Sequence, residues 1–285
     1  MKAMELTSSA PAAVEPQRNP RPSPLRELWN FRQLIALLVV RELKVRYKRS
    51  VLGLLWTMLN PLLLMVVYTV VFSTIWRSSI RNFSIFLLSA LLPWLFFSTA
   101  VLQGLHAVIG NQELIRKVRV PQAVFPLSVV GSNLVNFVLS QVPLLVLMFA
   151  LDQPFTPALL FLPLGMVILA VFTSGVTLFF ASATVFFRDV RHLVEVVLQM
   201  VMYLSPIFYD LRLMGEHGAW WFSIFKTCLK LNPLTYLLAL IREPVYYGRL
   251  PDPATLAIAC AAAAISLLGG FLFFQRLASR HIHYL

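Results

Sequence analysis

Five long stretches without Asp, Glu, Lys or Arg limit what this chain can fold into. They cover residues 50–76, 82–112, 120–151, 153–187 and 253–275. A helix needs about 20 apolar residues to cross the hydrocarbon core of a bilayer. Because every backbone polar group in lipid must be satisfied internally, such stretches fold as transmembrane helices. We therefore predict an all-α integral membrane protein.

A sixth stretch, residues 196–209, is uncharged but short. It reaches spanning length only if its helix begins near His192 and leaves Glu195 at the membrane surface. We include it because an even number of spans fits the distribution of charge better. The prediction is thus six transmembrane helices, with span five over residues 192–209 and span six over residues 253–275.

The charged residues are unevenly distributed between the connecting segments. The chain has 24 basic and 12 acidic residues, a net charge of +12. With the N-terminus in the cytoplasm, 17 of the 24 basic residues fall in inner segments. The inner segments are residues 1–49, 113–119, 188–195 and 276–285. Since Lys and Arg favour the cytoplasmic side, we predict a multi-pass protein of the cytoplasmic (inner) membrane with both termini in the cytoplasm, and no nucleic-acid partner.

The segments outside the predicted transmembrane domain, residues 50–275, differ in character. Residues 1–24 are rich in Pro, Ala and Arg and are expected to form a disordered cytoplasmic tail. Residues 276–285 are expected to form a cytoplasmic C-terminal tail. Residues 25–49 join a short apolar run to a basic run, which favours an amphipathic helix at the interface with membrane lipids. The basic run alternatively serves only to orient the chain.

The outer segment between spans five and six, residues 210–252, is too long and too apolar for a simple loop. Aromatic residues precede the Asn232-Pro233 pair, and a second helical stretch follows it. We predict two short re-entrant helices, shielded from lipid by protein. The alternative is an aromatic belt that lies flat on the outer leaflet.

The spans hold little that is typical of an enzyme. His106 is the single histidine in the five long stretches, and the sequence has no Gly-Lys dipeptide of a phosphate-binding loop. His281 and His283 form only a weak metal-ligand pattern, and the two cysteines match no metal site or disulfide framework. We therefore predict no catalytic residue, no metal and no cofactor in this chain, and any ATP-driven work requires a partner.

Uncharged polar and aromatic residues are present in the spans. Ser132, Asn136 and Ser140 recur at every fourth residue of span three, with Asn133 and Gln141 beside them, and so form one helix face. They either bond to neighbouring helices or line a wet path. Aromatic side chains in spans one and five either stack on sugar rings or only pack and anchor the helices. They are Tyr68, Phe72 and Trp76 in span one, and Tyr203, Phe208 and Tyr209 in span five.

Short motifs at the ends of the predicted spans carry a family resemblance. They are Arg41 to Ser50 (RELKVRYKRS) with Leu52-Gly53, Trp56 and Asn60-Pro61, then Leu114 to Pro121 (LIRKVRVP), Phe187-Arg188-Asp189 with His192, Ser205-Pro206 with Tyr209, and Asn232-Pro233. In this order they resemble the membrane subunit of ABC transporters of the ABC-2 type, in the branch that exports polysaccharides and polyol phosphates. The resemblance covers residues 25–280.

The resemblance implies a permease that works with other chains. Two copies would form a homodimer, and two copies of a separate nucleotide-binding subunit, which holds ATP and Mg²⁺, would dock beneath them. The residues implied in coupling to this ATPase are Arg116, Lys117, Arg119 and Pro121 in the 112–122 loop, and Arg188, Asp189 and His192 after span four. The loop's basic residues alternatively only set topology, and Arg188 with Asp189 alternatively caps span five.

The resemblance also implies the cargo, a glycan such as O-antigen carried on a polyprenyl diphosphate. A diphosphate is a dense anion, so a basic run at headgroup depth is a candidate for recruiting it. This run consists of Arg41, Lys44, Arg46, Lys48 and Arg49. The aromatic residues of spans one and five would guide the sugar chain. The re-entrant helices would form an outer gate that includes Trp220, Trp221, Asn232 and Pro233.

Two other functions fit parts of the same sequence. A permease for a drug or a small lipid would share the six spans, but the basic interface helix and the aromatic outer segment favour glycan export. A membrane enzyme that modifies polyprenyl phosphates would need clustered acids, whereas Glu113, Asp189 and Glu195 are scattered. We therefore expect an exporter subunit.

Overall fold

The computed structural model describes residues 28–48, 50, 52–71, 80–118, 120–210 and 220–284. All regular secondary structure in these residues is helical. The predicted tail of residues 1–24 lies outside them. So do four predicted site residues, Arg49, Phe72, Trp76 and Arg119. The backbone of Trp221 is described, but its side chain is not.

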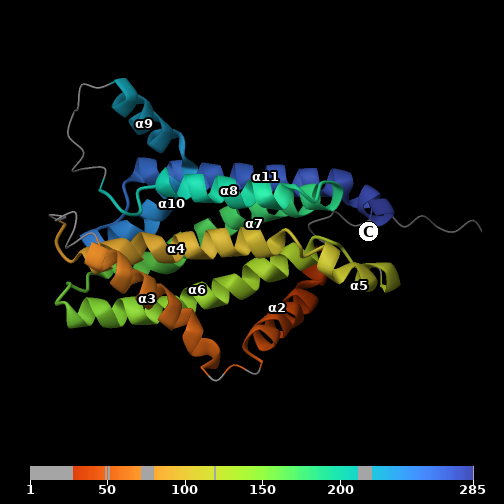
Figure 1. Cartoon of the computed structure of the whole chain (residues 1–285), viewed down its shortest axis with the longest axis horizontal. Helices are drawn as coiled ribbons and strands as arrows, with labels where there is room; N and C mark the ends of the chain where they lie inside the picture. The colour runs from red at the N-terminus through yellow and green to blue at the C-terminus, as the bar shows by residue number, and fades with distance from the viewer. Residues whose placement is uncertain are drawn as a thin grey trace, which may run out of the picture.

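Four helices are long and apolar enough to cross a membrane. They are α4 (Phe83–Gly104), α6 (Val124–Ala150), α7 (Leu162–Phe186), which continues the short helix η4 (Pro157–Phe161), and α11 (Pro253–Tyr284). Figure 1 shows them side by side in one bundle. These helices match four of the five long uncharged stretches, so the prediction of a multi-pass, all-helical membrane protein is confirmed.

The other helices are shorter. They are α2 (Arg32–Tyr47), η1 (Gly53–Leu55), α3 (Trp56–Val70), η3 (Ile109–Asn111), α5 (Gln112–Lys117), α8 (Val190–Tyr203), α9 (Trp220–Leu231), α10 (Pro233–Arg242) and the π-helical turn η5 (Glu243–Tyr247). Helix α3 has 15 residues and α8 has 14, so each is only about 21–23 Å long. Six spans therefore remain a prediction.

Helix α8 ends earlier than the predicted span five. It begins two residues before His192 but stops at Tyr203, and residues 204–209 form turns. Pro206 explains the early end, because proline has no backbone N–H and disfavours helical geometry in the residue before it. The aromatic residues Phe208 and Tyr209 consequently lie in a turn and not on the helix.

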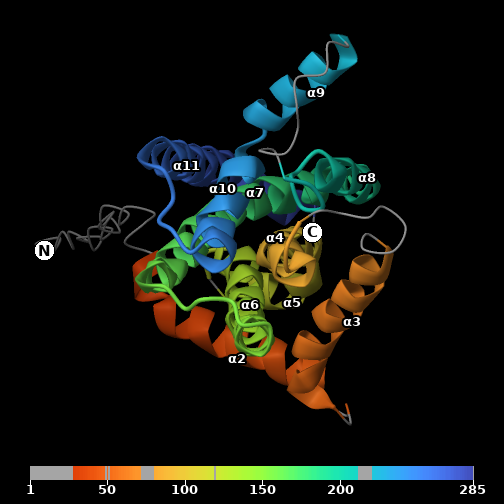
Figure 2. The same ribbon diagram turned by 90° about the vertical axis from the view of Figure 1, so that its left-hand side faces the viewer.

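Helices α9 and α10 are separated at Asn232, as the sequence predicts. The stretches Ser223–Leu231 and Pro233–Tyr247 meet at an angle of 74°, the geometry of a broken span or a re-entrant loop. Figures 1 and 2 show α9 standing away from the bundle, whereas α10 lies within it. Re-entry into the membrane remains a prediction.

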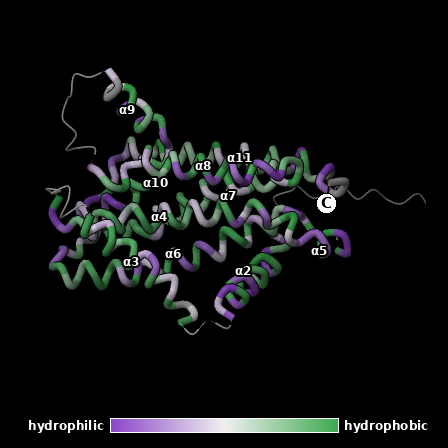
Figure 3. Tube along the Cα trace, viewed as in Figure 1, coloured by the Kyte–Doolittle hydropathy of each residue, from purple (hydrophilic) through white to green (hydrophobic). Residues whose placement is uncertain are grey.

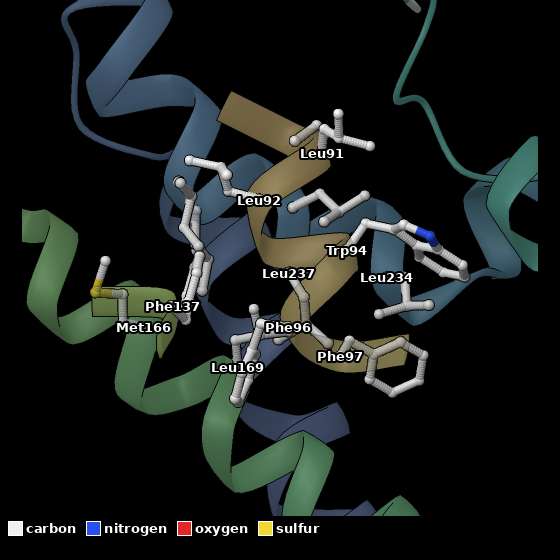
Figure 4. Close-up of a cluster of buried hydrophobic side chains, with 14 of the residues drawn as sticks. Leu91, Leu92, Trp94, Phe96, Phe97, Phe137, Met166, Leu169, Leu234 and Leu237 are labelled. Atoms are coloured by element: carbon white, nitrogen blue, oxygen red, sulfur yellow. The ribbon is translucent and has the colours of Figure 1, made fainter. Parts of the chain in front are cut away.

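Helix α4 lies at the centre of the molecule. In its membrane-spanning window 78% of the residues are buried, against 17% for α11. Figure 2 shows α3, α6, α7, α8 and α10 arranged around it. Figure 4 shows a cluster of buried apolar side chains around its middle, contributed by α4 itself and by α6, α7 and α10. A helix that is hydrophobic on all sides suits this enclosed position.

Helices α7 and α11 form the most extensive helix pair, and glycines let them approach closely. A Cβ atom on Gly175 would overlap the backbone of Ser266, and one on Gly270 would overlap the carbonyl of Gly175. Ser266 Oγ also donates a hydrogen bond of 2.9 Å to the Phe172 carbonyl. Small residues allow this close packing in lipid, where no hydrophobic effect draws helices together.

The predicted inner segments meet at one end of the bundle. Helix α5, the start of α8 and the end of α11 lie together there, whereas η4 and α10 lie toward the opposite end (Figure 1). Figure 3 shows the hydrophilic parts of the trace concentrated in α2, α5 and the ends of the bundle. This arrangement agrees with the alternation of segments assumed in the charge analysis.

Candidate functional site

A cavity of about 360 Å³ lies between α2, α3, α4 and α6. All four helices and the segment before α3 contribute to its polar lining. The polar lining residues are Arg46 and Tyr47 of α2, Ser50, Thr57 and Asn60 around α3, Thr99 of α4, and Asn133, Asn136 and Ser140 of α6. Apolar and aromatic side chains, including Trp56 and Phe96, complete the wall. A hydrophilic cavity within an apolar bundle is a candidate path or binding site for a polar molecule.

The polar face of α6 takes part in both arrangements that the sequence left open. Asn133, Asn136 and Ser140 line the cavity. Asn133 Nδ2 also donates to Gln103 Oε1 of the neighbouring α4 at 3.0 Å. Ser132 and Gln141 donate to carbonyls of their own helix, at 2.9 Å to Val129 and 3.1 Å to Phe137. The same stripe therefore lines a polar cavity and bonds to a neighbouring helix, while Gln141 Oε1 is buried without a hydrogen-bond partner among the described residues.

Arg46 points into the cavity and not toward the outer surface of α2. Its Nη1 atom donates to Asn133 Oδ1 at 3.2 Å, and Nη2 donates to Gln103 Oε1 at 2.5 Å. Tyr47 Oη donates to Asn136 Oδ1 at 3.1 Å. Both partners of the guanidinium are neutral amides, and Arg46 is the one charged residue among those described as lining the cavity. The cavity therefore carries an uncompensated positive charge.

The rest of the predicted basic cluster is placed differently. Arg41 donates to Glu42 at 2.9 Å and to Asn111 Oδ1 at 3.1 Å, which ties α2 to the loop before α5. Lys44 and Lys48 lie exposed on the outward face of α2. The structure thus separates Arg46 from the other described members of the cluster.

The exposed face of α2 mixes apolar and basic side chains. Leu37, Val40 and Val45 are exposed beside Lys44 and Lys48. The opposite face packs on α6 through the buried Leu38. Long basic side chains can keep their charges in water while their stems cover apolar surface, so this face suits a membrane boundary.

The predicted ATPase contacts lie at the end of the bundle where the predicted inner segments meet, which we call the inner end (Figure 1). Arg116 and Lys117 are exposed in the last turn of α5, and Pro121 is half-buried where the chain turns toward α6. Leu114 and Ile115 of the same helix pack against the apolar clusters beneath. Helix α5 therefore presents its basic residues outward while its apolar residues attach it to the bundle.

The second predicted contact lies at the start of α8. Arg188 and Asp189 are exposed, and Asp189 occupies the N-cap position without a capping hydrogen bond from its side chain. His192 Nδ1 lies 3.5 Å from Glu195, which also accepts a hydrogen bond of 2.9 Å from Arg191 Nε. The capping role that the sequence suggested for Asp189 is therefore not seen.

Aromatic residues from α3 and the end of α8 come together. The ring centroids of Tyr68 and Phe208 are 5.1 Å apart in an edge-to-face arrangement, and those of Tyr203 and Phe208 are 6.3 Å apart. Tyr209 Oη donates to the Tyr203 carbonyl at 3.0 Å. The structure thus brings Tyr68, Tyr203 and Phe208 into ring contact, with Tyr209 bonded to the Tyr203 backbone, and their role in a glycan channel remains a prediction.

The outer corner at Asn232 has clear structural bonds. Asn232 Oδ1 accepts from the Leu234 N–H at 3.0 Å, and so caps α10, while Pro233 occupies the first turn. Its Nδ2 atom donates to the Leu204 carbonyl at 3.0 Å and to Ser205 Oγ at 2.9 Å. Trp220, at the far end of α9, is 76% exposed.

A buried arginine at the outer end is absent from the sequence predictions. Arg242 is 7% exposed, donates to the Ile207 carbonyl at 3.1 Å and lies 4.0 Å above the ring of Phe86. Nearby, Tyr247 Oη donates to Asp210 Oδ2 at 2.5 Å. The proximity of Arg242 in α10 to the turn after α8 cannot be read from the linear sequence.

A second missed residue is His281, in the predicted C-terminal tail. Helix α11 continues through this segment to Tyr284, and the His281 side chain is fully buried. Burial lowers the pKa of His281 to about 4, so the imidazole is neutral at pH 7. Among the residues that the structure describes, no group of three or more His, Cys, Asp or Glu side chains could hold a metal. The one sequence hint is Phe274, seven positions earlier and on the same helix face.

Comparisons with known proteins agree with the fold. Residues 33–246 match the family model described as ABC-2 type transporter. The chain is 40% identical over 244 residues to the O-antigen export system permease protein RfbA of Myxococcus xanthus, an alignment that covers 86% of this chain and 92% of that protein.

Two further relatives extend the comparison. The O-antigen export system permease protein RfbA of Klebsiella pneumoniae is 33% identical over 228 residues, which cover 78% of this chain and 85% of that protein. The polysialic acid transport protein KpsM of Escherichia coli is 22% identical over 246 residues, which cover 85% and 92% of the two chains. The chain therefore belongs to the ABC-2 type transporter family, as a multi-pass membrane permease.

Proposed function

We propose that this chain is the membrane subunit of an ABC exporter that moves a lipid-linked polysaccharide across the cytoplasmic membrane. The names of its relatives, O-antigen export permease and polysialic acid transport protein, support this cargo class. ATP hydrolysis takes place in a separate nucleotide-binding subunit with bound Mg²⁺, because this sequence has no phosphate-binding loop.

The observation that carries the proposal is Arg46 in its cavity. A guanidinium that faces only neutral amides is poised to bind an anion, and the diphosphate of a polyprenyl carrier is such an anion. The surrounding amide and hydroxyl groups are suited to the first sugars of the glycan. Arg46 thus binds the head of the carrier. Lys44 and Lys48, together with Arg49, attract anionic lipid.

The working assembly is a homodimer of this chain with two ATPase subunits. Support comes from α3 and α8, which expose apolar faces that lipid or a second copy must cover. The exposed residues include Leu63, Val66, Val67 and Val70 of α3, and Val196, Val197 and Met200 of α8. With α3 and α8 counted as spans the permease has six, and the aromatic cluster at their outer ends lines the glycan channel.

The ATPase docks at the inner end and the glycan leaves at the outer end. Exposed Arg116 and Lys117, with Arg188 and His192, suit an acidic surface on the nucleotide-binding subunit. At the opposite end α9 and α10 form the outer gate as a re-entrant pair, hinged at Asn232. Both termini then lie in the cytoplasm.

The test uses the complex purified with its ATPase from the native membrane and placed in lipid vesicles. ATP-driven transport of a polyprenyl-diphosphate-linked glycan is compared with that of a hydrophobic dye. Arg46→Gln should lower glycan transport about tenfold, in line with the loss of hydrogen bonds to a charged group, and leave basal ATP hydrolysis unchanged. Arg32→Gln, an exposed arginine on the same helix, is the matched control.

Three results would contradict the proposal. Transport of the dye but not of the glycan would instead indicate a permease for a drug or small lipid. A permease that purifies without any ATPase would not be an ABC exporter subunit. Equal glycan transport by Arg46→Gln and Arg32→Gln would remove Arg46 from the site.

A further inference from the structure

His281 joins three separate parts of the chain at the inner end of the bundle. Its Nδ1 atom lies 2.7 Å from Gln122 Oε1, and its Nε2 atom lies 2.9 Å from Ser182 Oγ. These partners are 159 and 99 positions away in the sequence. The side chains of all three residues are at least nine-tenths buried. One imidazole therefore connects α11 to α7 and to the turn that leads into α6.

The hydrogen-bond pattern assigns the neutral ring a definite orientation. Gln122 offers an amide oxygen, which can only accept, so the proton lies on Nδ1 of His281. Nε2 then accepts from the Ser182 hydroxyl. The rings of Phe186 and Phe274 lie against the imidazole, with centroids 5.4 and 5.2 Å away. The group is thus held on all sides, and both of its polar atoms are satisfied.

Gln122 marks the downstream end of the loop that carries α5. Val124 N donates to the Pro121 carbonyl at 3.0 Å and Phe125 N to the Gln122 carbonyl at 3.2 Å, so the chain enters α6 directly at this residue. The upstream end of the same loop is tied separately, by the bond from Arg41 to Asn111. The loop that presents Arg116 and Lys117 is therefore anchored by polar side chains at both ends.

The two anchors differ in what they connect. Arg41 is exposed and holds the loop to α2 at the surface. His281 is buried and holds it to α7 and α11, the pair that packs so closely at Gly175 and Gly270. The remaining contacts around His281 are apolar and non-directional, whereas hydrogen bonds fix one register. Among the described residues, this imidazole gives the loop a directional polar link to α7 and α11, beside the apolar packing of Ile115 on the same two helices.

We propose that His281 is a positioning residue that ties the ATPase-docking loop to α7 and α11. Through this tie, closure of the nucleotide-binding subunits is converted into movement of these two helices. The inference rests on the proposed function insofar as α5 is the docking element. It assigns a mechanical role to a segment expected from sequence to be a tail.

Substitutions can separate the two hydrogen bonds. In His281→Asn the side-chain amide can still donate to Gln122, whereas His281→Gln places its amide nearer Ser182. Gln122→Met keeps the volume of the side chain but removes the acceptor. If the loop tie matters, His281→Gln and Gln122→Met should be defective and His281→Asn should be close to the unaltered chain. His106→Gln, an exposed histidine at the same end, is the control.

The first measurement needs no cargo. Hydrogen–deuterium exchange of α11 is followed in the complex of permease and ATPase before and after a non-hydrolysable ATP analogue is added. In the unaltered chain and in His281→Asn the analogue should change exchange in both the 112–122 loop and α11. In His281→Gln and Gln122→Met the change should be confined to the loop. An α11 response equal to that of the unaltered chain in both defective variants would overturn the proposal.

The second measurement is the number of glycans exported per ATP hydrolysed. The defective variants should lower this ratio about fivefold, the weight of one net hydrogen bond, while their melting temperatures stay close to that of His106→Gln. A parallel fall of export and hydrolysis, with the ratio unchanged, would overturn the coupling role. Absence of glycan export by the unaltered chain would contradict the proposed function alone, because the exchange measurement still decides on His281.

Discussion

Asn232 Nδ2 donates a hydrogen bond to Ser205 Oγ across 2.9 Å, and so joins two turns that lie 27 positions apart in the sequence. Ser205 is fully buried, and its hydroxyl donates a hydrogen bond to the Val201 carbonyl at 2.7 Å. Two Xaa-Pro motifs of the family resemblance, Ser205-Pro206 and Asn232-Pro233, are therefore adjacent in space. They form one corner that ends α8 and begins α10.

Asn232→Ala should destabilise this corner. It removes the N-cap of α10, which is worth about 1 kcal/mol, and leaves the Leu204 carbonyl without its side-chain donor. We expect a lower melting temperature of the detergent-solubilised chain. Asn232→Asp keeps the capping oxygen but not the donor, so its melting temperature should lie between those of Asn232→Ala and the unaltered chain. Thr227→Ala, on the exposed part of α9, should change the melting temperature little. Equal melting temperatures for Asn232→Ala and Thr227→Ala would contradict the role.

Gly175→Ala should separate α7 from α11. The added methyl group would collide with the backbone of Ser266, and backbone cannot give way as a flexible side chain does. Overpacking of this kind costs about 1–3 kcal/mol. Gly269→Ala is the matched control, because a methyl group there meets nothing within 4 Å. Thermal unfolding of both variants measures the difference, and a normal melting temperature for Gly175→Ala would disprove the close crossing.

Charge reversal on α5 should weaken the docking of the ATPase. The double variant Arg116→Glu with Lys117→Glu changes two exposed side chains in the last turn of α5, so the permease should fold normally. Its yield of co-purified ATPase should fall, and the loss should grow as salt is lowered, when like charges repel more strongly. Lys230→Glu at the opposite end should leave the yield unchanged. Undiminished co-purification would show that α5 is not the docking surface.

Removal of aromatic rings at the outer end should slow the passage of glycan. Tyr203 is 61% exposed and lies beside Phe208, so Tyr203→Ala removes a stacking surface with little loss of packing. We expect slower export in vesicles and unchanged basal ATP hydrolysis. Phe149→Ala, an exposed aromatic residue on α6, serves as the control. If both variants export at the same rate, the aromatic cluster serves packing and not transport.

Acid should destabilise the inner end of the bundle through His281. The pKa of this imidazole is about 4 in the folded chain, below the value of about 6.5 in an unfolded one. Between these values the unfolded state binds more protons, so stability is lost as the pH falls through this window. Melting temperatures measured from pH 7.5 to 4.5 should fall less steeply for His281→Asn than for the unaltered chain. Parallel curves would show that His281 is not the responsible group.

The sequence predicts which segments are apolar and at which end each connection lies. The long helices α4, α6, α7 and α11 follow from uncharged length alone, because lipid leaves a long apolar segment no alternative to a helix. The prediction that α5 lies on the cytoplasmic side follows from its basic residues. Both features depend on local composition, which is why a single sequence suffices for them.

The sequence does not predict which helix faces meet. Arg46 and Lys44 are equivalent by composition, yet one turns toward Asn133 and the other is exposed, because the face of α2 that packs on α6 is decided by neighbours far along the chain. The burial of His281 depends likewise on Gln122 and Ser182. The early end of α8 is predictable from the sequence, because Pro206 disfavours helical geometry in the residue before it.

The enclosure of α4 within a single copy has a mechanical consequence for an assembled pair. Because the helices that cover α4 come from the same chain, the core around it does not depend on a second copy. In the proposed homodimer, each chain would then move against its partner along exposed helices as a rigid body, and the proposed passage for a bulky polymer would widen without exposing the interior of either chain.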